Sequence, residues 1–184
     1  ALDWRRHAVG WCLLGESLTV RVSWLIPVRD RRRWLAEAVH SALMDSGPDD
    51  EILVIDDGSQ DRPEQVLPAD RKVQLLRQPP QGIVAALERG RREARGEFLA
   101  RLDSDDRSLP GRLDGQVRML QRDPAVVAVG GRACFHPDQS LPGRGMRHYM
   151  AWINGLSEPM KEILVECPLI HPAVMARAEA VEAA

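Results

Sequence analysis

Cysteine, net charge and long hydrophobic runs are scarce in this sequence of 184 residues. The three cysteines, Cys12, Cys134 and Cys167, are odd in number and widely spaced. They therefore form neither a disulfide framework nor a metal-ligand pattern, which favours a reducing compartment. The net charge of −2 gives no reason to expect a nucleic-acid partner, because phosphate backbones select strongly basic surfaces.

No apolar run is long enough to predict a membrane-spanning helix. The stretch within residues 1–19 is short and interrupted, unlike a spanning segment or the apolar core of a signal peptide. We interpret residues 1–19 as an upstream segment of unknown role. The basic residues are nearly all arginine, with Lys72 and Lys161 as the only lysines, and this bias indicates coding composition rather than phosphate recognition.

Apolar runs alternate with segments of helical period along most of the remaining chain. Continuous apolar runs are typical of buried parallel strands, and apolar residues three or four apart are typical of helices. This alternation predicts an α/β sandwich with a mostly parallel sheet. We expect Gly96 to cap the second helix. The predicted strands cover residues 20–28, 51–61, 73–78, 97–103 and 125–131, and the predicted helices cover residues 31–43, 82–94 and 110–121.

Polar residues follow three of the predicted strands. In open α/β sheets, ligands bind beyond the carboxyl ends of the strands, so we expect these residues to converge on one crevice. Two acidic clusters there would repel each other unless a cation or a cationic ligand group lay between them. The three segments are Pro27-Val28-Arg29-Asp30, Asp56-Asp57-Gly58-Ser59 and Asp103-Ser104-Asp105-Asp106.

The Asp56-Asp57 pair has two interpretations. As a strand-to-loop turn, it needs only the capping ability of Asp and the left-handed backbone that Gly58 permits. As a binding site, one of its carboxylates accepts a hydrogen bond from a nucleobase N–H or a ribose hydroxyl. The sequence alone leaves both interpretations open.

The second acidic cluster divides into two parts. Ser108 is a candidate cap for a helix that opens at Pro110, and Asp106 is explained by the dipole of that helix. Asp103 and Asp105, two residues apart on a backbone expected to be extended, project to the same side. Two hard oxygen ligands with no histidine or cysteine beside them suit Mg²⁺ or Mn²⁺, which completes its coordination with water and substrate phosphates.

Three stretches carry a resemblance to a known family: VSWLIPVRD, EILVIDDGSQD and GIVAALERGRREARGEFLARLDSDDRSLPGRLDGQVRML. From about Val22 to Ala180, the chain resembles the family 2 glycosyltransferases. The resemblance implies the GT-A fold, a Rossmann-like α/β sandwich with a mostly parallel central sheet, over residues 20–184. It implies transfer of a sugar from a nucleoside diphosphate, with a UDP-type donor favoured, to a hydroxyl acceptor.

The resemblance also implies roles for individual residues. Asp103-Ser104-Asp105 corresponds to the DXD element of the family, which holds Mn²⁺ or Mg²⁺ against the leaving diphosphate. The implied metal ligands are Asp103 and Asp105, with Asp105 on the metal and Asp103 near the ribose or the water shell of the metal. The implied nucleotide-sugar-binding residues are Pro27, Val28, Asp56, Asp57, Gly82, Asp103 and Ser104.

The acceptor side is matched less fully. CPLIHPAVMARAEAVEA is similar to the acceptor-side segment of many bacterial members, and His171 resembles a histidine found there. Members of this kind invert the anomeric centre with a general base from a later acidic motif, which we expect beyond Ala184, so that the domain is incomplete at its C-terminal end. Glu158 and Glu162 are interpreted as helix-face residues rather than as this base. The implied acceptor is a saccharide or a lipid-linked molecule of bacterial surface-polysaccharide synthesis. The implied location of the protein is the cytoplasm or the inner face of the membrane, with peripheral association as one alternative.

One departure from the family and two alternative functions remain. Arg29-Asp30 stands where the family usually has an aromatic residue followed by Asn. ILVIDDGS also resembles the first acidic strand end of a Mg²⁺-binding receiver domain, although Lys161 is a poor candidate for the lysine that such a domain requires. The third hypothesis is a truncated, non-catalytic nucleotide-binding domain.

Overall fold

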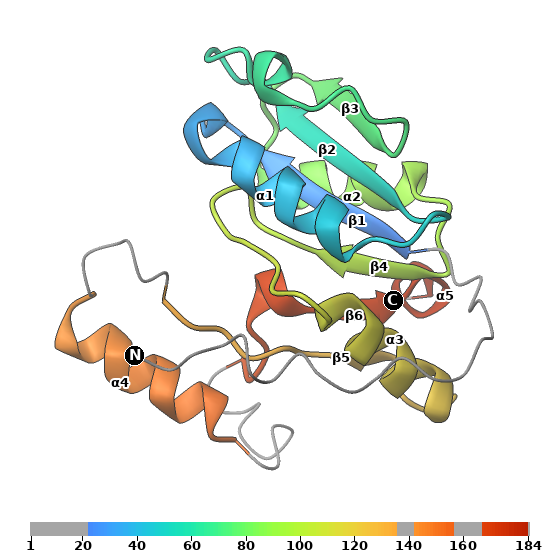
Figure 1. Ribbon diagram of the computed structural model, residues 1–184, viewed down its shortest axis with the longest axis vertical. Helices are drawn as coiled ribbons and strands as arrows, with labels where there is room; N and C mark the ends of the chain where they lie inside the picture. The colour runs from blue at the N-terminus through green and yellow to red at the C-terminus, as the bar shows by residue number, and fades with distance from the viewer. Residues whose placement is uncertain (1–21, 136–141, 157–166, 184) are drawn as a thin grey trace.

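The structure, a computed structural model of the chain, describes residues 22–135, 142–156 and 167–183 (Figure 1). The predicted upstream segment at residues 1–19 lies outside the described residues. The same is true of Glu158, Lys161 and Glu162. None of the helices in the described ranges is long and apolar enough to cross a membrane.

A six-stranded sheet of order β3-β2-β1-β4-β6-β5 forms the centre of the molecule (Figure 1). The first four strands along the chain pair in parallel, and β6 pairs antiparallel with both β4 and β5. The α/β sandwich with a mostly parallel sheet is therefore confirmed. The strands are β1 (Val22–Val28), β2 (Glu51–Asp57), β3 (Val73–Gln78), β4 (Phe98–Arg101), β5 (Ala128–Val129) and β6 (Met175–Arg177).

Helices cover both faces of the sheet. The larger core cluster joins one face to α1 and α3, and a smaller cluster joins the other face to α2. Helix α4 stands to one side of the sheet in Figure 1. The α-helices are α1 (Arg32–Asp45), α2 (Ile83–Glu93), α3 (Arg112–Arg122), α4 (Arg144–Asn154) and α5 (Ala178–Glu182), and two 3₁₀ turns cover Pro63–Val66 and His171–Ala173.

The strands read as continuous apolar runs because β1 and β2 are buried on both faces. Trp24 and Ile26 belong to the larger cluster, whereas Leu25 faces the smaller one. Helix α2 lies so close to the sheet that a Cβ on Gly90 would be 2.9 Å from Ile55 Cδ1. This close contact fixes the position of α2 on the sheet, and the N-terminus of α2 borders the candidate site.

The predicted cap of the third helix was wrong. Helix α3 begins at Arg112 rather than at Pro110, and no side chain of its own segment caps it. Asp45, the last residue of α1, instead accepts hydrogen bonds from the N–H groups of Gly111 and Leu113 at 2.8 and 3.0 Å. Ser108 Oγ also donates to this carboxylate, at 3.2 Å. A charged acceptor from a distant helix has replaced the local hydroxyl, which local sequence patterns do not reveal.

Two further expectations need correction. Helix α2 ends at Glu93, and the next residue, Ala94, has extended backbone. Gly96 does not cap the helix, because its N–H donates to Ser23 Oγ at 2.9 Å. The predicted strand over residues 125–131 is reduced to Ala128–Val129. Its partner β6 is only three residues long, so the pairing cannot extend far on either side.

Candidate functional site

A cavity of about 330 Å³ opens at the carboxyl edge of the sheet, beside the ends of β1, β2 and β4. This is where the strand order changes direction from β3-β2-β1 to β4, the switch point at which open α/β sheets bind ligands. The expected convergence of the three polar segments is present. The cavity is lined by Pro27, Val28, Arg29, Asp57, Gly82, Ile83, Ala86, Asp103, Ser104 and Asp105.

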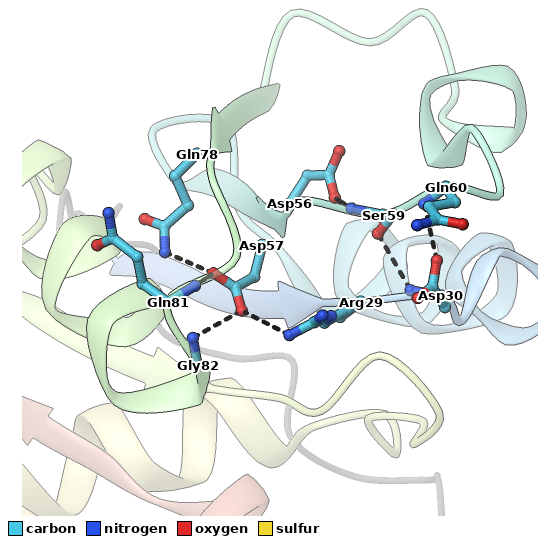
Figure 2. A network of polar contacts seen from close by, with 9 residues as sticks. All are labelled: Arg29, Asp30, Asp56, Asp57, Ser59, Gln60, Gln78, Gln81 and Gly82. Carbon is cyan, nitrogen blue, oxygen red and sulfur yellow. Dashed lines mark hydrogen bonds and ion pairs between the residues drawn. The ribbon is translucent and has the colours of Figure 1, made fainter.

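Asp57 is the most tightly held carboxylate in the cavity wall. It accepts hydrogen bonds from Gln78 Nε2 and from the backbone N–H groups of Gln81 and Gly82, all at 2.8 Å (Figure 2). Arg29 Nη1 lies 3.9 Å from it. Burial alone would raise the pKa of Asp57, but these donors and the arginine charge lower it. Asp57 is thus ionised, and it fixes the loop that leads into α2.

Asp56 faces away from this cavity. Its carboxylate accepts a hydrogen bond from the N–H of Ser59 at 2.8 Å (Figure 2). Arg77 Nε lies 3.6 Å from the same carboxylate. Gly58 adopts a positive φ of 74°, and a Cβ there would be 2.7 Å from Pro80. The turn interpretation therefore holds for Asp56. Asp57 lines the cavity, and its binding role stays a prediction.

The second acidic cluster forms a turn, so the expected extended backbone was wrong. The N–H of Asp106 donates to the carbonyl oxygen of Asp103 at 3.0 Å, with Ser104 and Asp105 at the corner. The turn still directs Asp103, Ser104 and Asp105 to the cavity. The turn therefore places Asp103 and Asp105 on the same side of the backbone, as had been expected from an extended strand.

The crowding of this cluster is visible in its electrostatics. Burial, together with the negative charges of Asp103 and Asp105, raises the pKa of Asp106 to about 6. Two arginines offset part of the charge. Arg101 Nη2 lies 3.0 Å from Asp103 Oδ1, and Arg31 Nε lies 3.8 Å from Asp105 Oδ2.

Asp103 and Asp105 fit a divalent cation that is bound jointly with a ligand. Within residues 22–135, 142–156 and 167–183, no three His, Cys, Asp or Glu side chains gather as a complete metal site. Mg²⁺ and Mn²⁺, however, commonly use one or two protein carboxylates and take their other ligands from water and phosphate. The two carboxylates lining this cavity satisfy that requirement.

A second cavity of about 290 Å³ adjoins the first through the shared residue Asp103. His171 lines it, and its Nε2 is 3.3 Å from Cys167 Sγ. Sequence reasoning had not proposed Arg101 for either site, although Arg101 lies only two residues before the DXD element. The remaining lining residues are Tyr149, Met150, Leu169, Ile170 and Pro172.

Comparisons with known proteins extend over nearly the whole described chain. A family model described as "Glycosyl transferase family 2" matches residues 23–182. An uncharacterized glycosyltransferase of Rickettsia felis is 32% identical over 160 residues, which are 84% of this chain and 25% of that protein. The glycosyltransferase GlyG of Streptococcus pneumoniae is 29% identical over 114 residues, 59% of this chain and 38% of that one.

Solved structures share the fold at low sequence identity. S. aureus TarS 1–349 superposes with a TM-score of 0.68 at 16% identity, covering 89% of this chain and 48% of that one. The mannosyltransferase PcManGT from Pyrobaculum calidifontis, in complex with GDP-Man and Mn²⁺, gives a TM-score of 0.66 at 18% identity, over 97% and 51%. The chain thus spans about half of these structures and about a quarter of the rickettsial relative.

Proposed function

Since the chain belongs to the family 2 glycosyltransferases and has the GT-A fold, we propose that it binds a nucleoside-diphosphate sugar and transfers the sugar to a hydroxyl acceptor. One observation carries the proposal. The cavity at the carboxyl edge of the sheet unites a buried, ionised carboxylate with a pair of more exposed ones. Such a site offers one acceptor for a nucleoside and two ligands for the cation of a diphosphate.

We assign the nucleoside to the part of the cavity formed by Pro27, Val28, Asp57 and Gly82. A carboxylate has about four acceptor positions, and Asp57 uses three of them on Gln78, Gln81 and Gly82. The fourth position is left for a nucleobase N–H or a ribose hydroxyl. Asp56 is not assigned to the nucleotide, because its carboxylate holds the turn at Ser59.

We assign the diphosphate to the part of the cavity beside Asp103, Ser104 and Asp105. The two aspartates would hold Mn²⁺ or Mg²⁺, which, when bound, stabilises the charge that develops on the leaving diphosphate. The structures that share the fold support this choice of ligand, because one contains GDP-Man with Mn²⁺ and another contains UDP-GlcNAc. A UDP-type donor remains our preferred substrate.

We assign the acceptor to the second cavity, which meets the first at Asp103 and contains His171. An inverting transfer needs a general base on the face of the sugar opposite the leaving group. The carboxylates that line the two cavities already have roles at the nucleotide and the cation, so the base is expected outside the described residues. With bacterial relatives such as that of Rickettsia felis, we favour a saccharide or lipid-linked acceptor of surface-polysaccharide synthesis at the cytoplasmic face of the membrane.

Calorimetric titration with UDP, with and without Mn²⁺, tests the proposal. We expect Mn²⁺ to tighten UDP binding, and Asp105→Ala to weaken the Mn²⁺-dependent binding by about tenfold or more, because a direct ligand is lost. Asp114→Ala is the matched control, since Asp114 is exposed on α3 and lines neither cavity. Equal affinities of the wild type and Asp105→Ala would remove Asp105 from the cation site.

The receiver-domain alternative predicts a different ligand. A receiver domain would bind the phosphoryl mimic beryllofluoride with Mg²⁺ and would not bind UDP. Its sheet is doubly wound with strand order 2-1-3-4-5, whereas this sheet has the order β3-β2-β1-β4-β6-β5 and an antiparallel β6. A non-catalytic nucleotide-binding domain would bind UDP with Mn²⁺ but would not release a sugar from UDP-sugar, which a turnover assay with candidate acceptors distinguishes.

A further inference from the structure

Arg101 forms an ion pair with one of the two candidate cation ligands. Its Nε donates to Asp103 Oδ1 at 3.0 Å, and its Nη2 lies 3.0 Å from the same oxygen. The two side chains are 22% and 29% exposed. A guanidinium therefore already neutralises the carboxylate that the proposed function gives to a divalent cation.

The backbone of Arg101 is fixed, whereas its side chain borders open space. Arg101 is the last residue of β4, where its N–H donates to Val174 O at 2.9 Å and its carbonyl oxygen accepts from Arg112 Nη2 at 2.8 Å. Its side chain lines the second cavity, of about 290 Å³, and is absent from the wall of the first. The guanidinium can therefore leave Asp103 by rotation of its side chain, without a change in the sheet.

We propose that Arg101 is an exchangeable counter-cation: it occupies Asp103 until a divalent cation arrives, and it then turns into the second cavity. The inference rests on the proposed function, because it requires that the cation bind at Asp103 and Asp105. It goes beyond that function by making Arg101 the residue that sets the affinity for the cation and that couples the two cavities.

Charge and geometry both favour exchange over simultaneous binding. A divalent cation on Asp103 and the guanidinium on the same carboxylate would lie within a few ångströms of each other, where like charges repel strongly even in partly exposed positions. The ion pair that is lost is worth little, because both partners are partly exposed and Arg101 remains near solvent. Once displaced, the guanidinium lies wholly in the cavity that contains His171, where it can pair with an anionic group of an acceptor.

The test is the dissociation constant of Mn²⁺, measured by electron paramagnetic resonance of the free ion, for wild type, Arg101→Met and Arg101→Lys. We expect Arg101→Met to bind Mn²⁺ roughly three- to tenfold more tightly than the wild type, the effect of removing one competing ion pair. Arg101→Lys should lie closer to the wild type, because it keeps the charge but not the planar fork. The measurement is made with and without UDP.

Arg29→Met is the matched control. It removes the same charge beside the first cavity, but Arg29 is 3.9 Å from Asp57 and leaves the Arg101–Asp103 pair intact. We expect a smaller shift for this control, which shrinks further at high salt because it acts only through space. The shift of Arg101→Met should persist at high salt.

Three results would overturn the inference while leaving the proposed function intact: equal Mn²⁺ affinity of wild type and Arg101→Met, equal shifts in Arg101→Met and Arg29→Met, or weaker binding by Arg101→Met. The last would mean that Arg101 orients Asp103 rather than competing for it. Absence of Mn²⁺ binding by every protein, even with UDP, would contradict the proposed function and this inference together.

Discussion

The two edges of the sheet carry similar acidic side chains with very different partners. At the amino edge, the Glu51 side chain is 4% exposed and accepts hydrogen bonds from Ser23 Oγ and from the backbone and guanidinium of Arg95. At the carboxyl edge, the side chains of Asp103 and Asp105 are 29% and 53% exposed, and each forms an ion pair with an arginine. We call the amino edge the closed edge, because the chain itself fills the acceptor positions of Glu51. We call the carboxyl edge the open edge, because Asp103 and Asp105 face a cavity.

This difference separates structural from ligand-binding carboxylates. A buried carboxylate whose acceptor positions are filled by the chain stabilises the fold, because removing it leaves donors without partners. A carboxylate with loose partners contributes little to the fold and remains able to bind a cation. Asp57 combines the two conditions, since it lines the open cavity but is held by three donors of the chain.

The largest expected effect is at the closed edge. Glu51→Ala should lower the free energy of unfolding by about 2–4 kcal/mol, because the Ser23 hydroxyl and the Arg95 N–H lose a charged acceptor in a buried position. Urea denaturation measures the change. Glu93→Ala, at an exposed position of α2, is the control. A loss below about 1 kcal/mol for Glu51→Ala would break the distinction between the edges.

A second closed carboxylate is Asp45, which joins α1 to the start of α3. Asp45→Ala should cost about 1–2 kcal/mol of unfolding free energy, the range for loss of a helix cap. Asp114→Ala, in the first turn of α3 but exposed, should change it by less than about 0.5 kcal/mol. Similar losses in the two variants would contradict the assignment of Asp45 as the cap.

The contribution of Asp57 to the free energy of unfolding should depend on pH. Its pKa is lowered in the folded protein, so its ionised form stabilises the fold above the unfolded pKa of 3.8, and this contribution is lost as the pH falls through the lower, folded pKa. Asp57→Asn should therefore cost about 1–2 kcal/mol at pH 7, and its difference from the wild type should shrink below about pH 4. Unfolding curves across this pH range provide the measurement. A pH-independent difference would refute the account of its charge.

The smallest effect on stability is expected at Asp105. Asp105→Asn should change the free energy of unfolding by no more than about 0.5 kcal/mol, because its side chain is 53% exposed and its arginine is 3.8 Å away. The same denaturation experiment measures it. A loss of more than about 1 kcal/mol would mean that the open edge also supports the fold.

Much of the fold could be predicted because buried parallel strands leave a strong local signal. The predicted strand over residues 73–78 matches β3, and the apolar runs of β1 and β2 reflect burial on both faces. The cap of α3 could not be predicted, since Asp45 lies 66 residues before Gly111 and meets it only in the folded chain. The short β6 strand, Met175–Arg177, is too brief for periodicity to indicate.

For the candidate site, the sequence indicated the edge of the sheet but not the partners. Asp56 and Asp57 point to opposite faces because side chains alternate along a strand, and only the position of α2 decides which one borders the cavity. The pairing of Arg101 with Asp103 was not proposed from the sequence, although residues two apart on an extended backbone project to the same side.

The most direct test of the central claim is paramagnetic broadening of backbone amide signals by Mn²⁺ in the presence of UDP. The account predicts selective broadening at the open edge, at Gly82, Ser104 and Asp105, while Glu51 and Gly96 at the closed edge keep their intensity. Mg²⁺ with UDP serves as the diamagnetic control. Broadening centred on Glu51 and Gly96, or no selective broadening at all, would contradict the claim that the open edge binds the nucleotide and its cation.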